Sequence, residues 1–540
     1  MTYHQALHSV IAPERAELLL QDGVILVADI YRPEGNGPWP VLLMRQPYGR
    51  TIASTVVLAH PSWYAAHGYM VVIQDVRGTG ESGGIFEAFV NEAADGKATL
   101  EWAANLPGSN GKIGLYGFSY HAMAQYLAIA GGGRRPDAIV PAMGSWTPRT
   151  DWAYEGNSFR LGLNVGWATQ MAMLSAAKRS DAEAYSALAS MKPAELRSFL
   201  AARPDLSHLS KWLQDDPAYW EAVSPGVLLR DDKLDIPALH IGGWYDFLLQ
   251  GTWAAGSAFR ARSPETSHLL IGPWTHAPWN RAGGSADMGT DAEISVDRAI
   301  VRFFDFYLKA AGERPDYVCL FDIGIREWHV LPSLPEVTRQ EYFLTSCGLA
   351  AAALTNGRLV SDVPARAVDT FVSDPFRPTP LVGGHFGSPA GFADRSMIDN
   401  RADVAVYTSE PFVADTTFIG EASATLELSS PSQIFDLSAA LSLVSPDGSA
   451  RVISTGHVRL NGPQASATIA LRPICVTVPA GYAVRLSLQG AAAPVFEVHP
   501  GSDAFAPVPD MLRKPIPISI HHGGAFRSRL IMPQVQNVCR

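Results

Sequence analysis

The sequence predicts an α/β protein followed by an all-β part. Its 540 residues are enough for about three domains. Residues 1–144 alternate strand-like and helix-like segments, and the same rhythm returns at residues 236–335. Residues 145–235 have helical spacing, and residues 340–540 alternate apolar and polar side chains with period two. These three sequence patterns indicate a parallel sheet with helices on both faces, a helical insertion, and a β-sandwich or jelly roll.

The first segment begins with a predicted β-hairpin. Residues 16–31 are strand-like on both sides of Asp22-Gly23, a dipeptide typical of tight hairpin turns. Short apolar runs follow at residues 41–44, 69–73 and 113–116, and the stretches between them, such as residues 91–104, are long enough for helices. Apolar strands separated by helices predict a parallel sheet that is buried on both faces.

The insertion at residues 145–235 is rich in Ala, Leu, Trp and Met. It has helical spacing at residues 177–191 and 193–202. Strand-like runs resume at 236–241 and 268–272, and a helical stretch follows at 297–310. Ligands of open α/β sheets bind beyond the carboxyl ends of the strands. An insertion that enters and leaves at that edge should therefore cover the pocket.

The C-terminal part has the pattern of antiparallel strands. Period-two alternation occurs at residues 423–429, 437–444, 450–460, 466–472 and 482–488, with turn residues such as Pro446-Asp447-Gly448 between them. All 13 tryptophans of the chain lie at or before Trp328. This uneven distribution predicts a domain boundary near residues 330–350.

Composition disfavours several classes of protein. The net charge of −10 argues against a nucleic-acid partner, which needs a basic surface. The four cysteines lie far apart without a CxxC pair, which disfavours a disulfide scaffold and a structural zinc site. No apolar run approaches the ~18 residues of a membrane span. The first residues also lack the basic and apolar regions of a secretory signal. We therefore expect a cytoplasmic protein without a membrane partner.

The strongest local signal for chemistry is the segment GFSYH, from Gly117 to His121. An apolar strand-like run precedes it, and a helix-like run with small residues follows it. A sharp turn between a strand and a helix exposes a serine at the edge of a sheet, and a nearby glycine lets the two backbones pass closely. The pattern predicts Ser119 as a nucleophile. Such motifs usually end in glycine, whereas this chain has His121, and the sequence leaves the role of that histidine open.

A serine nucleophile needs a base that takes its proton and an acid that orients the base. In sites of this kind the acid and then the base follow the serine along the chain, each just after a strand of the same sheet. Asp246 and His276 meet both requirements. Asp235 is the rival acid, but it precedes its strand and should lie at the wrong end of the sheet. Asp246 could alternatively be a helix cap.

Acyl transfer also needs hydrogen-bond donors for the negative charge that develops on the carbonyl oxygen. The backbone N–H of Tyr120, directly after the predicted nucleophile, is one candidate. The hydroxyl of Tyr48, which follows the strand-like run at 41–44, is the second candidate. Packing is the alternative role for the Tyr48 side chain.

Five motifs now stand in order along the chain. They are Pro47-Tyr48, the stretch DVRGTGESGG at residues 75–84, Gly117–Tyr120, Gly243–Asp246 and Gly272–His276. Together they resemble the cocaine esterase/X-Pro dipeptidyl-peptidase family, which includes α-amino acid ester hydrolases and a glutaryl-cephalosporin acylase. The resemblance spans nearly the whole chain. It implies an α/β-hydrolase domain with an inserted helical cap, plus a C-terminal jelly-roll domain.

The resemblance also implies a role for each matching residue. Ser119 is similar in position to the nucleophile, Asp246 to the orienting acid and His276 to the base, with Tyr48 and the Tyr120 amide as oxyanion donors. It implies a serine hydrolase that cleaves an ester or amide bond of a small-molecule acyl substrate, without a metal or organic cofactor. The alternatives are an X-Pro dipeptidyl-peptidase, an α-amino acid ester hydrolase or acylase, and a non-catalytic ligand-binding protein. Family members are often oligomeric, so a homo-oligomer is allowed, although no sequence feature sets the number of subunits.

Aromatic side chains close to the predicted strand ends suit an apolar or aromatic acyl group, although packing of the cap onto the core explains them equally well. The candidates are Trp146, Trp152, Tyr154, Trp167, Trp244 and Trp274. Asp151 and Glu155 could form an anionic subsite for a substrate ammonium group. Arg149 and Arg160 lie just as near in sequence and could neutralise them, or bind a carboxylate instead, and the sequence does not choose among these roles. The glycine-rich stretch at 75–84 is interpreted as structural.

Overall fold

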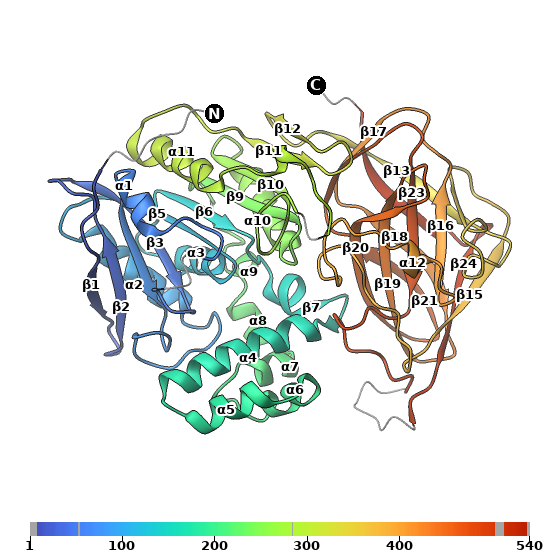
Figure 1. Ribbon diagram of the computed structural model, residues 1–540, viewed down its shortest axis with the longest axis horizontal. Coiled ribbons are helices and arrows are strands. Elements are labelled where there is room, and N and C mark those ends of the chain that lie inside the picture. The colour runs from blue at the N-terminus through green and yellow to red at the C-terminus, as the bar shows by residue number, and fades with distance from the viewer. Residues whose placement is uncertain (1–7, 52–54, 283–284, 503–511, 537–540) are drawn as a thin grey trace.

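The computed structural model describes residues 8–51, 55–282, 285–502 and 512–536. Cys539 and the first residues, on which the secretion argument depends, lie outside these ranges. Figure 1 shows a sheet with helices around it in the N-terminal part and a second, strand-rich part that lies beside it. Within the described residues, no helix is both long and apolar enough to cross a membrane.

The first sheet has ten strands in the order β1-β2-β4-β3-β5-β6-β9-β10-β11-β12. Its central strands, from β4 to β11, pair in parallel, while β1, β2 and β12 pair antiparallel at the two ends. The strands are β1 (Glu14–Leu19), β2 (Ile25–Tyr31), β3 (Trp39–Gln46), β4 (Met70–Asp75), β5 (Ser109–Phe118), β6 (Ala138–Ala142), β9 (Ala238–Tyr245), β10 (Ser267–Thr275), β11 (Val318–Asp322) and β12 (Glu327–Leu331). The predicted hairpin and parallel sheet are both present.

Helices cover both faces of this sheet, as expected for buried parallel strands. One face carries α1 (Pro61–Ala66) and α11 (Val296–Lys309), and the other carries α2 (Glu92–Ala104), α3 (Tyr120–Ala130) and α10 (Leu249–Arg262). On the first face Phe303 and Phe304 of α11 are fully buried. On the second face Tyr126 and Phe259 are fully buried. The sheet is therefore the middle of three layers.

The chain leaves the sheet after β6 and returns at β9, and the intervening helices form the cap. Figure 1 shows these helices along one side of the molecule, below the sheet. The cap comprises a short π-helix (Arg149–Ala153), the strand pair β7 (Tyr154–Glu155) and β8 (Ser158–Phe159), and the helices α4 (Leu161–Lys178), α5 (Ala182–Ser190), α6 (Pro193–Ala201), α7 (Leu209–Gln214), α8 (Pro217–Ala222) and α9 (Pro225–Leu228).

Two details differ from the expected elements. The predicted helix at 177–191 is interrupted, because Ser180 adopts a φ of 56° and the side chain of Asp181 accepts a hydrogen bond from the Ala184 amide. That bond starts a new helix, α5, instead of continuing α4. Strands β11 and β12, by contrast, were not anticipated as separate elements, and both are only five residues long.

The C-terminal part of the chain forms the second sheet, which has 13 strands. It contains β13 (Val337–Thr345), β14 (Arg358–Val360), β15 (Ala367–Ser373), β16 (Val404–Ser409), β17 (Thr416–Gly420), β18 (Ser423–Ser429), β19 (Ile434–Val444), β20 (Ala450–Asn461), β21 (Gln464–Ala470), β22 (Ile474–Val478), β23 (Ala483–Gln489), β24 (Ile516–His522) and β25 (Arg529–Val535). The helix α12 (Ser396–Asp399) lies before β16. Nearly all pairs are antiparallel, which agrees with the period-two pattern.

The all-β part packs directly against the cap. The amide of Arg459 in β20 donates to the carbonyl of Gly156 at 2.7 Å, and the His457 ring bonds to the Ser158 hydroxyl at 2.9 Å. A side chain at Gly156 would place its Cβ 2.2 Å from the carbonyl oxygen of His457, so only glycine allows this approach. The all-β part thus closes one side of the cap.

Candidate active site

Ser119 lies at the turn between β5 and α3, the position that the motif predicts. Its backbone is strained, with φ 62° and ψ −122°, a conformation that non-glycine residues rarely adopt. Gly117 has a φ of 131°, and a Cβ there would lie 2.5 Å from the Cβ of His121. The strand can therefore turn into the helix only with glycine at 117. The turn presents the Ser119 hydroxyl beyond the carboxyl end of β5.

Asp246 and His276 directly follow two neighbouring strands, so they lie side by side. Tyr245 of β9 pairs with Thr275 of β10, so the next residue on each strand is a member of the predicted pair. His276 Nδ1 lies 2.8 Å from Asp246 Oδ1, and His276 Nε2 lies 3.0 Å from Ser119 Oγ. The rival acid Asp235 precedes β9 and pairs with Arg135. The structure therefore joins serine, histidine and aspartate in one hydrogen-bonded chain.

The surroundings of this chain keep the imidazole in place. Asp246 is fully buried, while 24% of the His276 side chain is exposed. The ring of Phe247 lies over His276 with 4.2 Å between centroids, and Phe118 lies 5.4 Å away. The indole of Trp279 donates a 2.9 Å hydrogen bond to the His276 carbonyl oxygen. These contacts hold the histidine between the buried acid and the serine.

Tyr48 lies close to the serine, at the carboxyl end of β3. Its hydroxyl oxygen accepts a 3.2 Å hydrogen bond from the indole N–H of Trp167 in α4. Burial raises the pKa of Tyr48 to about 12, and the hydrogen bonds to Trp167 and Ser119 offset that rise only in part. The hydroxyl thus keeps its proton over the working range of an enzyme. Because Trp167 donates to the oxygen, the tyrosine proton is left to be donated elsewhere.

Tyr120 contributes in two ways. It is the first residue of α3, so its backbone N–H is one of the first amides of the helix, which have no acceptor within it. Its side chain points into the core, where the hydroxyl donates to Glu92 at 2.9 Å and accepts from the Phe89 amide at 3.2 Å. The side chain anchors the turn, and the amide lies next to the serine.

His121 packs beneath the turn rather than joining the hydrogen-bonded chain. It is almost completely buried, and its ring lies 6.0 Å from that of Tyr48 and 5.5 Å from that of Phe118. Burial and the nearby His276 lower the pKa of His121 to about 3. The imidazole is therefore neutral at any ordinary pH and fills space where most such motifs have glycine.

Two of the predicted substrate residues lie near the hydrogen-bonded chain of Ser119, His276 and Asp246. Trp167 bonds to Tyr48, and Trp152 packs on Trp167 with 5.1 Å between centroids. Trp152 also contacts Phe247, whose ring covers His276. Both indoles belong to a buried aromatic cluster of the cap. Their contact with a substrate remains a prediction.

The other four aromatic candidates take part in packing. Trp146 lies against Tyr126 and Phe259 on the far side of the sheet. The Tyr154 hydroxyl donates to the carbonyl of Trp212, the Trp244 indole to that of Phe321, and the Trp274 indole to that of Ala292. None of these contacts involves Ser119, His276 or Asp246. They illustrate the packing alternative that the sequence left open.

The carboxylate of Asp151 makes its hydrogen bonds within the cap. It accepts hydrogen bonds from the Ser145 hydroxyl and from the amides of Trp146 and Thr147. Burial raises its pKa to about 6 despite these bonds. Arg149, a candidate to neutralise it, pairs instead with Asp215 at 2.7 Å.

Glu155 is the acceptor of two arginines. Arg160 binds it at 3.1 Å, and Arg472 of the all-β part binds both of its oxygens. Burial opposes ionisation, but the two guanidinium groups outweigh it and lower the pKa of Glu155 to about 2. The structure thus shows the neutralisation by Arg160 that the sequence offered as one alternative. An ammonium subsite at Asp151 and Glu155 has no support from these contacts.

The glycine-rich stretch at 75–84 forms a tight loop around Asp75. The carboxylate of Asp75 accepts from the Arg50 amide at 2.7 Å and from the Arg50 side chain at 2.8 Å. A Cβ at Gly80 would lie 2.1 Å from this carboxylate. Arg77 forms two bonds to Asp95, at 2.9 and 2.7 Å. Asp75 and Arg77 therefore hold the loop, which agrees with the structural role expected for this stretch.

One group of side chains could in principle hold a metal ion. Within the described ranges, Asp322, His329 and Cys475 are the set whose ligand atoms lie within 4.8 Å of one another. However, the Asp322 carboxylate already accepts hydrogen bonds from the Thr477 amide at 2.9 Å, the Thr477 hydroxyl at 2.6 Å and His329 at 3.0 Å. These bonds join β11 to β22, so the group is better explained as a contact between the two sheets.

Sequence reasoning missed several residues around the site. Phe247 follows the predicted acid directly, but nothing in the motif marks it as a ring that covers the histidine. Met171, Leu174 and Lys178 of α4 line a pocket beside Tyr48. Their spacing of three and four residues is the one signal that could have placed them on a common helix face.

Comparison with known proteins shows the family of the chain. Residues 22–278 match the X-Pro dipeptidyl-peptidase (S15) family, and residues 310–531 match the X-Pro dipeptidyl-peptidase C-terminal non-catalytic domain. A cocaine esterase from Rhodococcus sp. strain MB1 Bresler is 30% identical over 475 residues, which cover 82% of each chain.

Solved structures show the same fold at lower identity. An aminopeptidase from a marine sediment archaeon, Thaumarchaeota archaeon, matches with a TM-score of 0.78 over 97% of both chains at 20% identity. An α-amino acid ester hydrolase matches with a TM-score of 0.77, at 19% identity, over 99% of this chain and 98% of its own. The chain therefore belongs to the cocaine esterase/X-Pro dipeptidyl-peptidase family of α/β-hydrolases, and it is a serine ester hydrolase.

Proposed function

We propose that Ser119, His276 and Asp246 are the catalytic triad of an enzyme that hydrolyses a small acyl ester through an acyl-enzyme. The observation that supports it is the continuous chain of two hydrogen bonds, 3.0 Å from Ser119 to His276 and 2.8 Å from His276 to Asp246. Nucleophile, base and orienting acid each have the neighbour that acyl transfer requires. The strained backbone of Ser119 is typical of such a nucleophile.

In the proposed first step, His276 Nε2 takes the proton of the Ser119 hydroxyl as Oγ forms a bond to the carbonyl carbon. The negative charge that develops on the carbonyl oxygen is stabilised by the Tyr48 hydroxyl and the Tyr120 amide. Asp246 accepts a hydrogen bond from Nδ1 and stabilises the imidazolium. The bond to the leaving group then breaks, and the leaving oxygen or nitrogen takes the proton from His276 Nε2.

The second step repeats this chemistry with water. His276 takes a proton from the water, whose oxygen bonds to the acyl carbon, and Ser119 leaves with a proton from His276. The site is covered by α4 through Trp167 and by the all-β part through Phe386, whose ring stacks on Phe247 at 5.2 Å. An enclosed site of this kind favours a small-molecule substrate over a macromolecule.

An ester is the favoured substrate over an N-terminal dipeptide. A dipeptidyl-peptidase or an α-amino acid ester hydrolase needs an anionic group for the substrate ammonium. The two acidic candidates are both engaged, Asp151 by Ser145 and Glu155 by two arginines. Amide hydrolysis by the same triad, and a cytoplasmic location, stay predictions.

The test is a hydrolysis screen of aryl esters, β-lactam amides and dipeptidyl anilides with the protein and its Ser119→Ala variant. We expect turnover of aryl esters by the parent, none by the variant, and the same thermal unfolding for both. A fluorophosphonate probe should label the parent at Ser119. Substantial activity in the variant would refute the assignment, and absence of labelling would favour a non-catalytic binding protein.

A further inference from the structure

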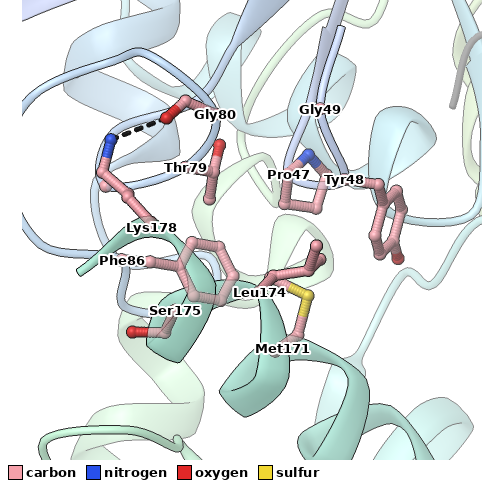
Figure 2. Close-up of a pocket in the computed structure, with 11 residues that line it drawn as sticks. Pro47, Tyr48, Gly49, Thr79, Gly80, Phe86, Met171, Leu174, Ser175 and Lys178 are labelled. Carbon is pink, nitrogen blue, oxygen red and sulfur yellow. Dashed lines mark hydrogen bonds between the residues drawn. The ribbon is translucent and has the colours of Figure 1, made fainter. Parts of the chain in front are cut away.

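A cavity of about 190 Å³ lies beside Tyr48, between α4 and the loop that follows β4. Figure 2 shows Tyr48 on one side of it and Lys178 on the other, with Phe86, Met171 and Leu174 between them. Tyr48 links this cavity to the chemistry, because its side chain lines the cavity while its hydroxyl is near enough to Ser119 for the serine to affect the pKa of the tyrosine. A carbonyl group held at the Tyr48 hydroxyl would therefore have one of its two arms beside the cavity.

The walls of the cavity are mainly apolar. Pro47, Phe86, Met171 and Leu174 present hydrocarbon or thioether surfaces. Met171 is buried, whereas Leu174 is 37% exposed and stands at the mouth. For comparison, a cavity of about 150 Å³ with apolar walls holds one benzene molecule. This cavity is therefore large enough for a phenyl ring or for a chain of about six carbons.

Lys178 is the one formal charge among the lining residues. Its ammonium donates to the carbonyl of Gly80 at 2.8 Å and to that of Ser82 at 2.7 Å. Partial burial lowers its pKa below the ordinary value, while the carboxylates of Asp75 and Glu81 act in the opposite direction. Two of its three donors are therefore in use, and two negative charges lie within electrostatic reach. Such an ammonium ties α4 to the loop and does not call for an anionic ligand.

We propose that this cavity, which we call the Tyr48 pocket, binds an uncharged apolar arm of the substrate, and that Leu174 and Met171 set the length of that arm. The inference rests on the proposed function, because it takes Ser119 as the nucleophile. Both the acyl group and the leaving alcohol can supply this arm, since either is an apolar chain attached to the same carbonyl.

Two ester series distinguish the two sources of the arm. In one series the acyl group of p-nitrophenyl esters is lengthened from two to eight carbons, and in the other the alcohol of acetate esters is lengthened over the same range. We expect kcat/KM to rise about fourfold for each methylene, up to about six carbons, in only one of the two series. The series that shows the rise identifies the part of the substrate that enters the pocket. An arm that ends in a carboxylate should be a poorer substrate than the uncharged arm of equal length.

Variants at the mouth test the pocket itself. Leu174→Trp fills it and should abolish the dependence of kcat/KM on arm length, while Leu174→Ala should shift the optimum to longer arms. Ala177→Trp is the matched control, because it adds the same side chain to an exposed position of α4 that does not line the pocket. This control should keep the dependence of the parent. An unaltered dependence in Leu174→Trp, or a preference for the carboxylate arm, would overturn the proposal.

A binding measurement separates this proposal from the assignment of the triad. The Ser119→Ala variant is titrated with hexyl hexanoate by calorimetry, and so is the double variant that also carries Leu174→Trp. We expect the double variant to bind about tenfold more weakly. Equal affinities would overturn the pocket even if Ser119 is the nucleophile. Conversely, a tenfold difference in affinity between the two variants, together with no fluorophosphonate labelling of Ser119 in the parent, would support the pocket and refute the triad.

Discussion

The substitution Tyr48→Phe removes one hydroxyl and leaves the ring in place. In the structure this hydroxyl accepts a hydrogen bond from Trp167 at 3.2 Å and is near enough to Ser119 for the serine to affect the pKa of the tyrosine. With a pKa of about 12 it remains protonated, and therefore a donor, at any ordinary pH. The variant thus tests whether Tyr48 donates to the developing oxyanion.

The expected loss follows from the number of donors. Two donors are proposed, the Tyr48 hydroxyl and the Tyr120 amide, and removal of one oxyanion donor costs about 10²–10³ in kcat, or about 3–4 kcal/mol in the transition state. KM should change little, because the ground-state carbonyl carries less charge than the oxyanion. A second effect is on folding, since the indole N–H of Trp167 loses its acceptor. That loss should lower the free energy of unfolding by about 1–3 kcal/mol.

The assay is steady-state hydrolysis of an aryl ester, combined with urea unfolding of the same preparation. Tyr126→Phe is the matched control, because that tyrosine is equally part of the hydrolase core but packs against Trp146 and Phe259 on the other side of the sheet. It should retain the parent kcat. A Tyr48→Phe variant with a kcat within threefold of the parent would refute the reasoning, and so would a loss that appears only in KM.

Three further predictions concern the stability of the site and of the cap. Gly117→Ala should lower the free energy of unfolding by about 1–3 kcal/mol, because Gly117 has a φ of 131° and the new Cβ would lie 2.5 Å from that of His121. Urea unfolding measures this loss. Most of the activity on aryl esters should be lost as well. Glu155→Gln should destabilise the protein by about 3–5 kcal/mol, because it leaves two buried guanidinium groups without a countercharge; thermal unfolding measures this. Acid should also destabilise the protein, since burial lowers the pKa of three histidines from 6.5 to about 3: His121, His208 and His240. The unfolded chain binds protons on these residues below pH 6.5 while the folded protein does not, so at pH 5 each histidine should cost about 2 kcal/mol of stability relative to pH 7, as measured by urea unfolding.

Each of the three has a control within the chain. Gly166→Ala in α4 meets nothing within 4 Å and should be neutral or slightly stabilising. Glu336→Gln, at an exposed position, should leave thermal unfolding unchanged. His121→Leu should reduce the loss of stability between pH 7 and pH 5, whereas the exposed His60→Gln should not. Equal stability of the parent at the two pH values would contradict the acid argument.

Local pattern was sufficient wherever one segment determines its own structure. The alternation at residues 423–429 predicts a strand, and β18 spans Ser423–Ser429. Strand, glycine, serine and helix are contiguous at residues 113–130, so the sharp turn at Ser119 could be read without knowing the rest of the chain. Asp246 and His276 could be paired because residues that end neighbouring parallel strands meet at the same edge of the sheet.

Contacts between distant segments could not be inferred in this way. Trp167 is 119 residues from Tyr48, and Arg472 is 317 residues from Glu155, so no spacing rule connects them. The sequence gives no sign that Glu155 is paired with Arg472, yet this arginine of the all-β part neutralises it. The Tyr48 pocket likewise exists only because α4 lies across the loop at residues 78–86.

The sequence by itself therefore determined the class of fold and pointed to Ser119, Asp246 and His276, which the structure brings into one hydrogen-bonded chain. Each of these depends on local hydrophobic period or on strand ends, which short-range sterics and the hydrophobic effect control. The tertiary structure decided which charges are free and which are paired, which aromatic rings reach Ser119 and which only pack, and where a substrate arm can enter. Those properties depend on how separate segments share space and on how burial changes the cost of a charge.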